Sequence, residues 1–260
     1  MKSLKTILTM GLLLVSTTSF AQFANGGNSS NGSNGGGLVK KTDNYSRIYV
    51  GYNPMTLTYD IKGVDDFTYP GLTFGFTQGI NLSKNLPLFL EVGARFTFNF
   101  KSVSDDEDND EDDDYYYSLK KSASRAGNYW DDDSDDDDED EVGKTKYTAA
   151  SLTVPINIAY KLSFAGGDFS VTPFLGVTLK GNLISKEKYE LGKEKETIDN
   201  FNKKHVGKDG QWKRFQAGWQ IGTNLDYKAF SLGLHYGSDF TEVCKKTKSK
   251  NFCISLGYNF

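Results

Sequence analysis

The feature of this sequence that most constrains its fold is a repeated alternation of apolar residues with polar residues or glycine. Between Leu88 and Phe100, Leu, Val, Ala and Phe occupy every second position, and most positions between them are polar or glycine. A period of two places successive side chains on opposite faces of a chain, so each such segment is predicted to be a β-strand. We expect eight strands, within residues 47–52, 71–77, 88–100, 151–162, 169–180, 214–226, 230–237 and 252–260.

The connections between these segments decide which all-β fold they form, because a soluble sandwich also alternates. Short turns at 83–85, 165–167 and 228 alternate with long polar stretches at 54–66, 101–146, 185–211 and 239–250. All long loops therefore meet at one end and all short turns at the other, as in outer-membrane barrels. An even, closed set of strands also pairs every backbone donor within lipid. The sequence predicts an all-β fold, an eight-stranded antiparallel up-and-down transmembrane β-barrel.

Composition agrees with many short strands and excludes several other classes. The chain has 18 Phe, 15 Tyr and 27 Gly, and these residue types suit pleated surfaces and turns. Two cysteines exclude a disulfide scaffold, and no apolar run is long enough for a membrane-spanning helix. Glycine-rich phosphate loops, zinc-ligand spacings and nucleic-acid modules are absent from the sequence, so we expect no cofactor and no nucleic-acid partner.

The N-terminal region predicts export. Lys2 and Lys5 precede an apolar run from Ile7 to Val15, and small and polar residues then lead to Ala21, which is the layout of a secretory signal peptide. We expect a signal peptide over 1–21, a flexible Asn/Gly/Ser-rich leader over 22–43 and the barrel over 44–260. The predicted location is the outer membrane of a Gram-negative cell, with a periplasmic N-terminus and extracellular long loops.

Several charged residues are predicted to face the barrel lumen. Eight strands enclose a space that side chains alone can fill, so these charges are expected to pair and to plug the barrel. A gated ion path is the alternative interpretation of the same residues. The predicted lumenal charges are Arg47, Glu91, Arg95, Lys161, Lys180, Arg214 and Asp226.

The long stretch 101–146 is strongly acidic, with 19 acidic and 6 basic residues, which leaves 15 acidic and 24 basic residues in the rest of the chain. Like charges repel, so we expect an extended, solvated loop. Carboxylates suit divalent cations, but the EF-hand spacing fails at Glu111, so no specific metal site is predicted. Weak Ca²⁺ candidates are Asp106, Asp108, Asp110, Asp112, Asp135 and Asp137. Basic partners are a further candidate for this loop, and the lysine-rich stretch 186–212 is a candidate for contact with it or with lipopolysaccharide phosphates.

The two cysteines and two histidines leave further questions open. An exported protein permits a disulfide between Cys244 and Cys253, whereas strand alternation points them to opposite faces. His235 is expected to face the lumen, and Gly237 stands where the His-x-Ser pattern of lipid A deacylases has its nucleophile. We therefore expect no enzyme activity, with His235 packed among other lumenal side chains.

The eight segments, the exported N-terminus, the stretch from Leu152 to Ile158 and the C-terminal Phe260 together resemble the eight-stranded outer-membrane β-barrel family of Bacteroidota, including its PorT-like proteins. The resemblance covers residues 45–260 and implies a fold and a location but no defined activity. It also implies that Phe260 is read by the barrel-assembly machinery. We expect a non-enzymatic protein with an envelope structural role or a surface-interaction role through its extracellular loops, in contact with outer-membrane lipid and lipopolysaccharide. The alternatives are a small ion or solute channel and a lipid-modifying enzyme.

Overall fold

The computed structural model of this chain describes residues 43–60, 64–83, 85–104, 143–191 and 194–260. The predicted signal peptide, all but the last residue of the predicted leader, and the six aspartates proposed as weak Ca²⁺ ligands lie outside these residues. Predictions that concern them stay predictions.

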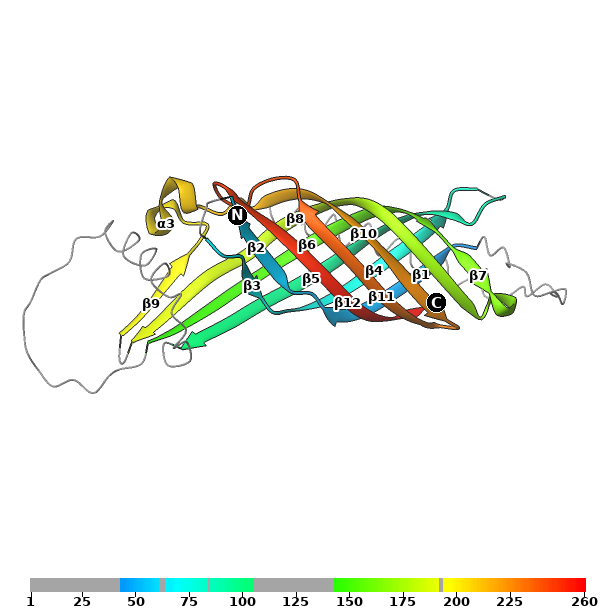
Figure 1. The fold of residues 1–260 in the computed structure, drawn as a ribbon, viewed down its shortest axis with the longest axis horizontal. Helices are drawn as coiled ribbons and strands as arrows, with labels where there is room; N and C mark the ends of the chain where they lie inside the picture. The colour runs from blue at the N-terminus through cyan, green and yellow to red at the C-terminus, as the bar shows by residue number, and fades with distance from the viewer. Residues whose placement is uncertain (1–42, 61–63, 84, 105–142, 192–193) are drawn as a thin grey trace, which may run out of the picture. The chain divides into compact units, whose positions relative to one another are not determined.

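Eight strands form a closed ring (Figure 1). In ring order they are β1 (Tyr45–Tyr52), β4 (Gly71–Asn81), β5 (Leu88–Ser104), β6 (Lys144–Tyr160), β8 (Phe169–Leu191), β10 (Phe215–Tyr227), β11 (Phe230–Asp239) and β12 (Thr247–Asn259). Each pairs with its neighbours in antiparallel fashion, and β1 pairs with β12 from Arg47 opposite Asn259 to Tyr52 opposite Ile254. This closure leaves the ring without an open edge. The predicted eight-stranded antiparallel up-and-down barrel is confirmed.

The barrel is apolar outside and polar inside. Large apolar side chains on its outer face are exposed, among them Leu72, Leu175 and Leu256. The buried side chains between them are mostly charged, amide or hydroxyl groups, such as Glu91, Asn157 and Thr172. This is the reverse of a water-soluble protein and is the arrangement that a membrane-spanning barrel requires.

Exposed aromatic residues lie near both ends of this apolar band. Toward the short turns they are Phe164, Phe169, Tyr227, Phe230 and Tyr258, and toward the long connections they are Phe100, Phe215, Tyr236, Phe240 and Phe252. Aromatic girdles of this kind mark the two interfaces between membrane and water. Within the described residues, no helix combines the length and the hydropathy needed to cross a membrane.

The end of the barrel with the long connections, here called the loop end, is more ordered than the sequence predicts. Strands β5, β6 and β8 contain 17, 17 and 23 residues, and β8 pairs beyond the ring with β9 (Glu194–Asp199), followed by α3 (Lys203–Gly210). The predicted loops 101–146 and 185–211 are thus partly wrong, since their flanks continue as strands. The reason is that these flanks are polar on both faces, so backbone pairing continues without a visible period of two.

The first hairpin is also longer than predicted. The short strand β2 (Met55–Tyr59) lies within the predicted loop 54–66, and β3 (Phe67–Tyr69) directly follows that loop. The two strands continue β1 and β4 across Pro54 and Pro70. At this break the Asn99 side-chain amide donates to the carbonyls of Asn53, Tyr69 and Pro70 at 3.1, 3.3 and 3.4 Å. The Asn99 amide thus provides hydrogen bonds to backbone carbonyl groups where the regular strand pairing is interrupted.

The opposite end, here called the turn end, carries the short connections. The connection between β6 and β8 contains β7 (Leu162–Phe164) and the 3-10 turn η1 (Ala165–Gly167). The chain reverses direction at Gly166 and Gly167, which have φ angles of 70° and 103°. These angles fall in the region that glycine adopts without steric cost. The predicted alternation of short and long connections is therefore present in the fold.

Candidate functional site

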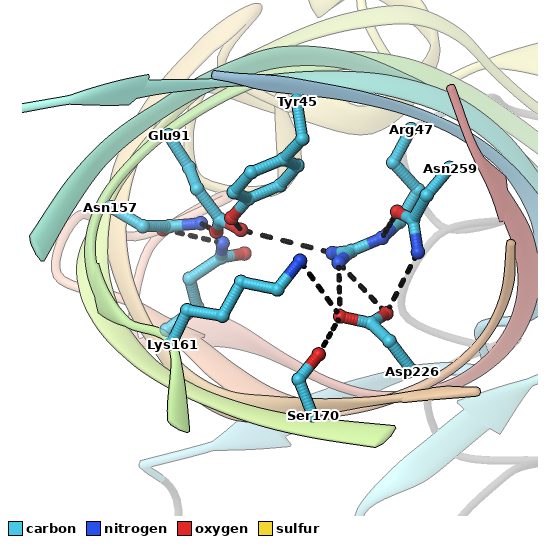
Figure 2. A network of polar contacts seen from close by, with 9 residues as sticks. Tyr45, Arg47, Glu91, Asn157, Lys161, Ser170, Asp226 and Asn259 are labelled. Atoms are coloured by element: carbon cyan, nitrogen blue, oxygen red, sulfur yellow. Dashed lines mark hydrogen bonds and ion pairs between the residues drawn. The ribbon is translucent and has the colours of Figure 1, made fainter. Parts of the chain in front are cut away.

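A network of buried charges spans the lumen near the turn end (Figure 2). The Arg47 guanidinium on β1 lies 3.1 Å from an Asp226 carboxylate oxygen on β10 and 3.8 Å from a Glu91 oxygen on β5. Lys161, which follows β6, lies 3.7 Å from the other Asp226 oxygen. Three strands and the residue that follows β6 thus direct opposite charges toward the same point.

Neutral side chains complete this network. Tyr45 and Asn157 donate to the two Glu91 oxygens at 2.5 and 3.1 Å. Ser170 and Asn259 donate to the two Asp226 oxygens at 3.1 and 3.0 Å. Both buried carboxylates are therefore paired and hydrogen-bonded, which is what makes burial of charge tolerable.

A second cluster surrounds Arg95 on β5. Its side chain is 4 % exposed, and its Nη1 group donates to the Nε2 atom of His235 on β11. The neighbour of His235 on β12 is Cys253, which is fully buried. Among the described residues no carboxylate forms an ion pair with Arg95, and its Nε atom has no hydrogen-bond partner.

A third cluster lies toward the loop end. Lys180 Nζ is 2.5 Å from Asp239 Oδ2 and 2.7 Å from Ser249 Oγ, and the same serine donates to Asp239 at 2.5 Å. Serine–lysine pairs act as nucleophile and base in some hydrolases, but the base must be an uncharged amine. Here Lys180 donates to both Asp239 and Ser249, and Ser249 donates to Asp239, so the serine proton is directed to the carboxylate and not to the lysine nitrogen. The geometry favours a structural ion pair.

A hydrophobic cluster lies on the lumenal face at the loop end. It consists of Leu57, Tyr69, Tyr147, Trp212 and Val243, which come from β2, β3, β6, the segment after α3 and the β11–β12 connection. Leu57 stands opposite Ser249 in the sheet, so the cluster continues the lumenal face. The Tyr147 ring lies 5.6 Å from the Tyr69 ring, in an edge-to-face arrangement. An apolar closure of this kind excludes water and opposes ion passage.

The outer surface of the loop end is basic. Exposed cations gather on α3, on the two residues before β10, on the β11–β12 connection and at the start of β12, namely Lys203, Lys204, Lys208, Lys213, Arg214, Lys245, Lys246 and Lys248. We call these eight residues the basic surface. Lys213 pairs with Glu242 at 3.7 Å and Lys245 with Asp209 at 2.7 Å. The hydrogen bond between Lys245 and Asp209 lowers the pKa of the Asp209 carboxyl and raises the pKa of the Lys245 ammonium group.

The structure places six of the seven charges predicted to be lumenal inside the barrel: Arg47, Glu91, Arg95, Lys161, Lys180 and Asp226. The prediction for Arg214 is wrong. This residue precedes β10 and is exposed, with its guanidinium carbon 4.1 Å from the centre of the Phe201 ring. Alternation could not fix its direction because the strand begins only at Phe215.

Sequence reasoning missed Asp239, Ser249 and the hydrophobic cluster. Asp239 and Ser249 fell inside a predicted loop, although Asp239 continues the alternation of His235 and Gly237 on the inward face. That continuation was a usable signal. The hydrophobic cluster left no such signal in the sequence, because its members are distant in the chain.

The two cysteines are free thiols in the structure, so the disulfide that the compartment permits is not formed. Cys253 faces the lumen on β12, whereas Cys244 packs against the hydrophobic cluster in the β11–β12 connection. Burial raises the pKa of the Cys244 thiol. The C-terminal Phe260 is exposed on the outer face, and its backbone N–H donates to Ser46 at 2.9 Å. Its role in assembly stays a prediction.

An apolar groove of about 530 Å³ lies on the lipid-facing side of β1, β10, β11 and β12. Val50, Phe230, Leu232 and Leu256 are among its lining residues, which include no histidine, cysteine or carboxylate. Among the described residues no three His, Cys, Asp or Glu side chains form a group that could hold a metal ion.

The model of the outer membrane protein beta-barrel domain matches residues 122–241, which are 120 of the 260 residues. No curated protein sequence matches the chain significantly. The matched domain and the apolar outer surface together support an outer-membrane location for this barrel.

The chain is also similar to solved structures, three of which follow. Ail, the attachment invasion locus protein of Yersinia pestis, is 13% identical, with 84% of this chain and 99% of that chain covered and a TM-score of 0.41. The outer membrane enzyme PagL is 10% identical, with coverage of 82% and 98% and a TM-score of 0.37. An outer membrane channel from Pseudomonas putida F1 is 11% identical, with coverage of 89% and 100% and a TM-score of 0.28. Because all three TM-scores lie below 0.5, none of these likenesses bears on activity.

Proposed function

We propose that this protein is a non-enzymatic outer-membrane barrel whose loop end faces the cell exterior and binds partners there. The observation that carries the proposal is the length of β5, β6 and β8, which contain 17, 17 and 23 residues. A tilted strand crosses a membrane in about 9 to 11 residues. The remainder of these three adjacent strands projects beyond the membrane, and β9 extends the same sheet.

The projecting sheet is held together by its own contacts. Glu190 accepts from Lys146 at 2.8 Å and from Lys188 at 2.6 Å, and these hydrogen bonds lower its pKa to about 2. A surface that is ordered before binding loses less conformational entropy when a partner arrives. This favours a role in contact with partners over a role as a flexible tether.

The interior supports the same proposal. Ion pairs lie near the turn end and near the loop end, and a hydrophobic cluster follows them. A filled interior is expected of a scaffold, whereas a channel needs a continuous wet path. Neither the channel nor the lipid-modifying enzyme gains a specific observation in its favour, and the link to PorT-like barrels of Bacteroidota remains a hypothesis.

The chemistry of the partner is suggested by the basic surface. Arg214 directly precedes the exposed Phe215, and the backbone N–H of the exposed Phe240 donates to Ala217 on β10. Arg214 therefore sits beside aromatic residues at the edge of the lipid-facing band. That is the level of lipid headgroups. Lysine and arginine at this level attract phosphate groups, so we propose lipopolysaccharide phosphates as the ligand. Divalent cations or basic partners at the acidic loop stay separate predictions.

The test is titration of fluorescently labelled lipopolysaccharide onto the refolded full chain in detergent. The triple variant K203Q/K204Q/K248Q removes three charges from the basic surface. The matched control K144Q/K186Q/K195Q removes three exposed lysines from the projecting sheet. We expect the first variant to lose roughly tenfold in affinity, because each lysine near an anionic surface is worth about 1 kcal/mol before screening. Equal affinity of both variants and the parent protein would contradict a phosphate-binding basic surface.

A further inference from the structure

Among the described residues, the barrel lumen contains one more buried positive charge than its buried carboxylates can pair. Its buried cations are Arg47, Arg95, Lys161 and Lys180, and its buried carboxylates are Glu91, Asp226 and Asp239. Every carboxylate is engaged by a cation other than Arg95: Glu91 by Arg47, Asp226 by Arg47 and Lys161, and Asp239 by Lys180. Four cations against three carboxylates leave a net charge of +1, and the unpaired group is Arg95.

Within the described residues, no carboxylate neutralises the charge of Arg95. Its side chain is 4 % exposed, its Nη1 group donates to the neutral nitrogen Nε2 of His235, and its Nε atom has no acceptor. Guanidinium groups do not lose their proton in proteins, so burial cannot neutralise it as it would a lysine. A buried, unpaired charge is strongly unfavourable. The arrangement therefore calls for an anion.

We propose that the lumen binds one small monovalent anion of the halide class, chloride in the cell, beside Arg95 and His235. Arg95 supplies the charge and an unused Nε donor. When His235 accepts from Arg95 at Nε2, its ring proton is on Nδ1, which provides a second donor. A single negative charge matches the excess, and a small ion suits a lumen that is otherwise filled by side chains.

The ion is structural and does not permeate. On the turn side it is separated from water by the network of Arg47, Glu91 and Asp226, and on the loop side by the hydrophobic cluster around Tyr147 and Trp212. Its role would be to neutralise Arg95 so that the guanidinium can remain at the centre of the barrel. This inference does not depend on the proposed contact function of the loop end.

Bromide is the probe, because it replaces chloride and is detected separately. The full chain, refolded in detergent, is dialysed to equilibrium against millimolar sodium bromide in a gluconate buffer, and bound bromide is measured by mass spectrometry. We expect about one bromide per chain, the amount that neutralises one unpaired cation. R95Q is expected to bind none, and the control K195Q, at an exposed lysine on β9 outside the basic surface, is expected to bind as the parent protein does.

A second measurement keeps the test decisive if R95Q does not refold. Crystals of the parent protein grown with bromide are expected to show an anomalous scattering peak within hydrogen-bond distance of Arg95 Nε. Thermal unfolding should also occur at higher temperature in chloride than in gluconate at equal ionic strength. Absence of bound bromide, retention of bromide by a folded R95Q variant, or an anomalous map without a peak beside Arg95 would each overturn the proposal.

Discussion

Arg47 and Asp226 lie 179 positions apart in the sequence, yet their side chains meet across the barrel lumen at 3.1 Å. The two residues come from β1 and β10, which are separated in the ring by β11 and β12. The ion pair therefore joins two strands that are not neighbours in the wall through the interior. Because β1 is one of the two strands that close the ring, the two buried charges neutralise each other only when the barrel is closed.

Removing one member of this pair is expected to destabilise the barrel strongly. D226N leaves the Arg47 and Lys161 charges without that carboxylate, and R47M leaves Asp226 without its nearest cation. Breaking a buried pair costs about 3 to 5 kcal/mol, which urea unfolding in detergent can measure. The double variant R47M/D226N is expected to cost less than the sum of the two, because it leaves fewer unpaired charges. Additive losses would show that the two residues do not interact.

A close approach in the wall gives a second prediction. A side chain added at Gly75 would place its Cβ 2.3 Å from the Tyr49 ring, whereas at Gly181 the nearest atom is a backbone oxygen at 3.8 Å. We expect G75A to lose about 1 to 3 kcal/mol through overpacking, and the matched variant G181A to lose less. Replacing Tyr49 by Leu in the G75A background is expected to restore part of the loss. Equal unfolding midpoints for both glycine variants would contradict the packing of Tyr49 into the space over Gly75.

Much of this interior could be predicted from the sequence, and there is a physical reason why the rest could not. Strand alternation directed Arg47, Glu91 and Asp226 inward, because a barrel wall with lipid on one side enforces the period of two. The pairing partners were not predictable, because register across the lumen depends on strand tilt and closure.

The loop end shows where alternation loses its meaning. Outside the membrane both faces of a strand meet water, so the polar flanks of β5, β6 and β8 carry no signal and were taken for loops. The hydrophobic cluster was missed because Leu57, Tyr147 and Trp212 come from segments that are distant in the chain and meet only in three dimensions. Long-range packing of this kind leaves no local pattern.

The projecting sheet makes a prediction about acidity. Hydrogen bonds from Lys146 and Lys188 lower the pKa of Glu190 from 4.5 to about 2, so the charged form of Glu190 is favoured in the folded sheet. The stabilisation is present above pH 4.5 and is lost as pH falls through 2. NMR titration of the Glu190 carboxyl should give a midpoint near 2, and K146Q should move it toward 4.5. A midpoint near 4.5 in the parent protein would mean that these hydrogen bonds do not form.

The measurement that tests the central claim most directly is planar-bilayer conductance of the refolded chain, with and without millimolar Ca²⁺. The paired charges and the cluster of Leu57, Tyr69, Tyr147, Trp212 and Val243 predict a membrane-inserted barrel that conducts no ions under either condition. Insertion should be verified by protease protection, so that silence reflects a closed barrel. A stable unit conductance would contradict the account and make the lumenal charges determinants of ion selectivity.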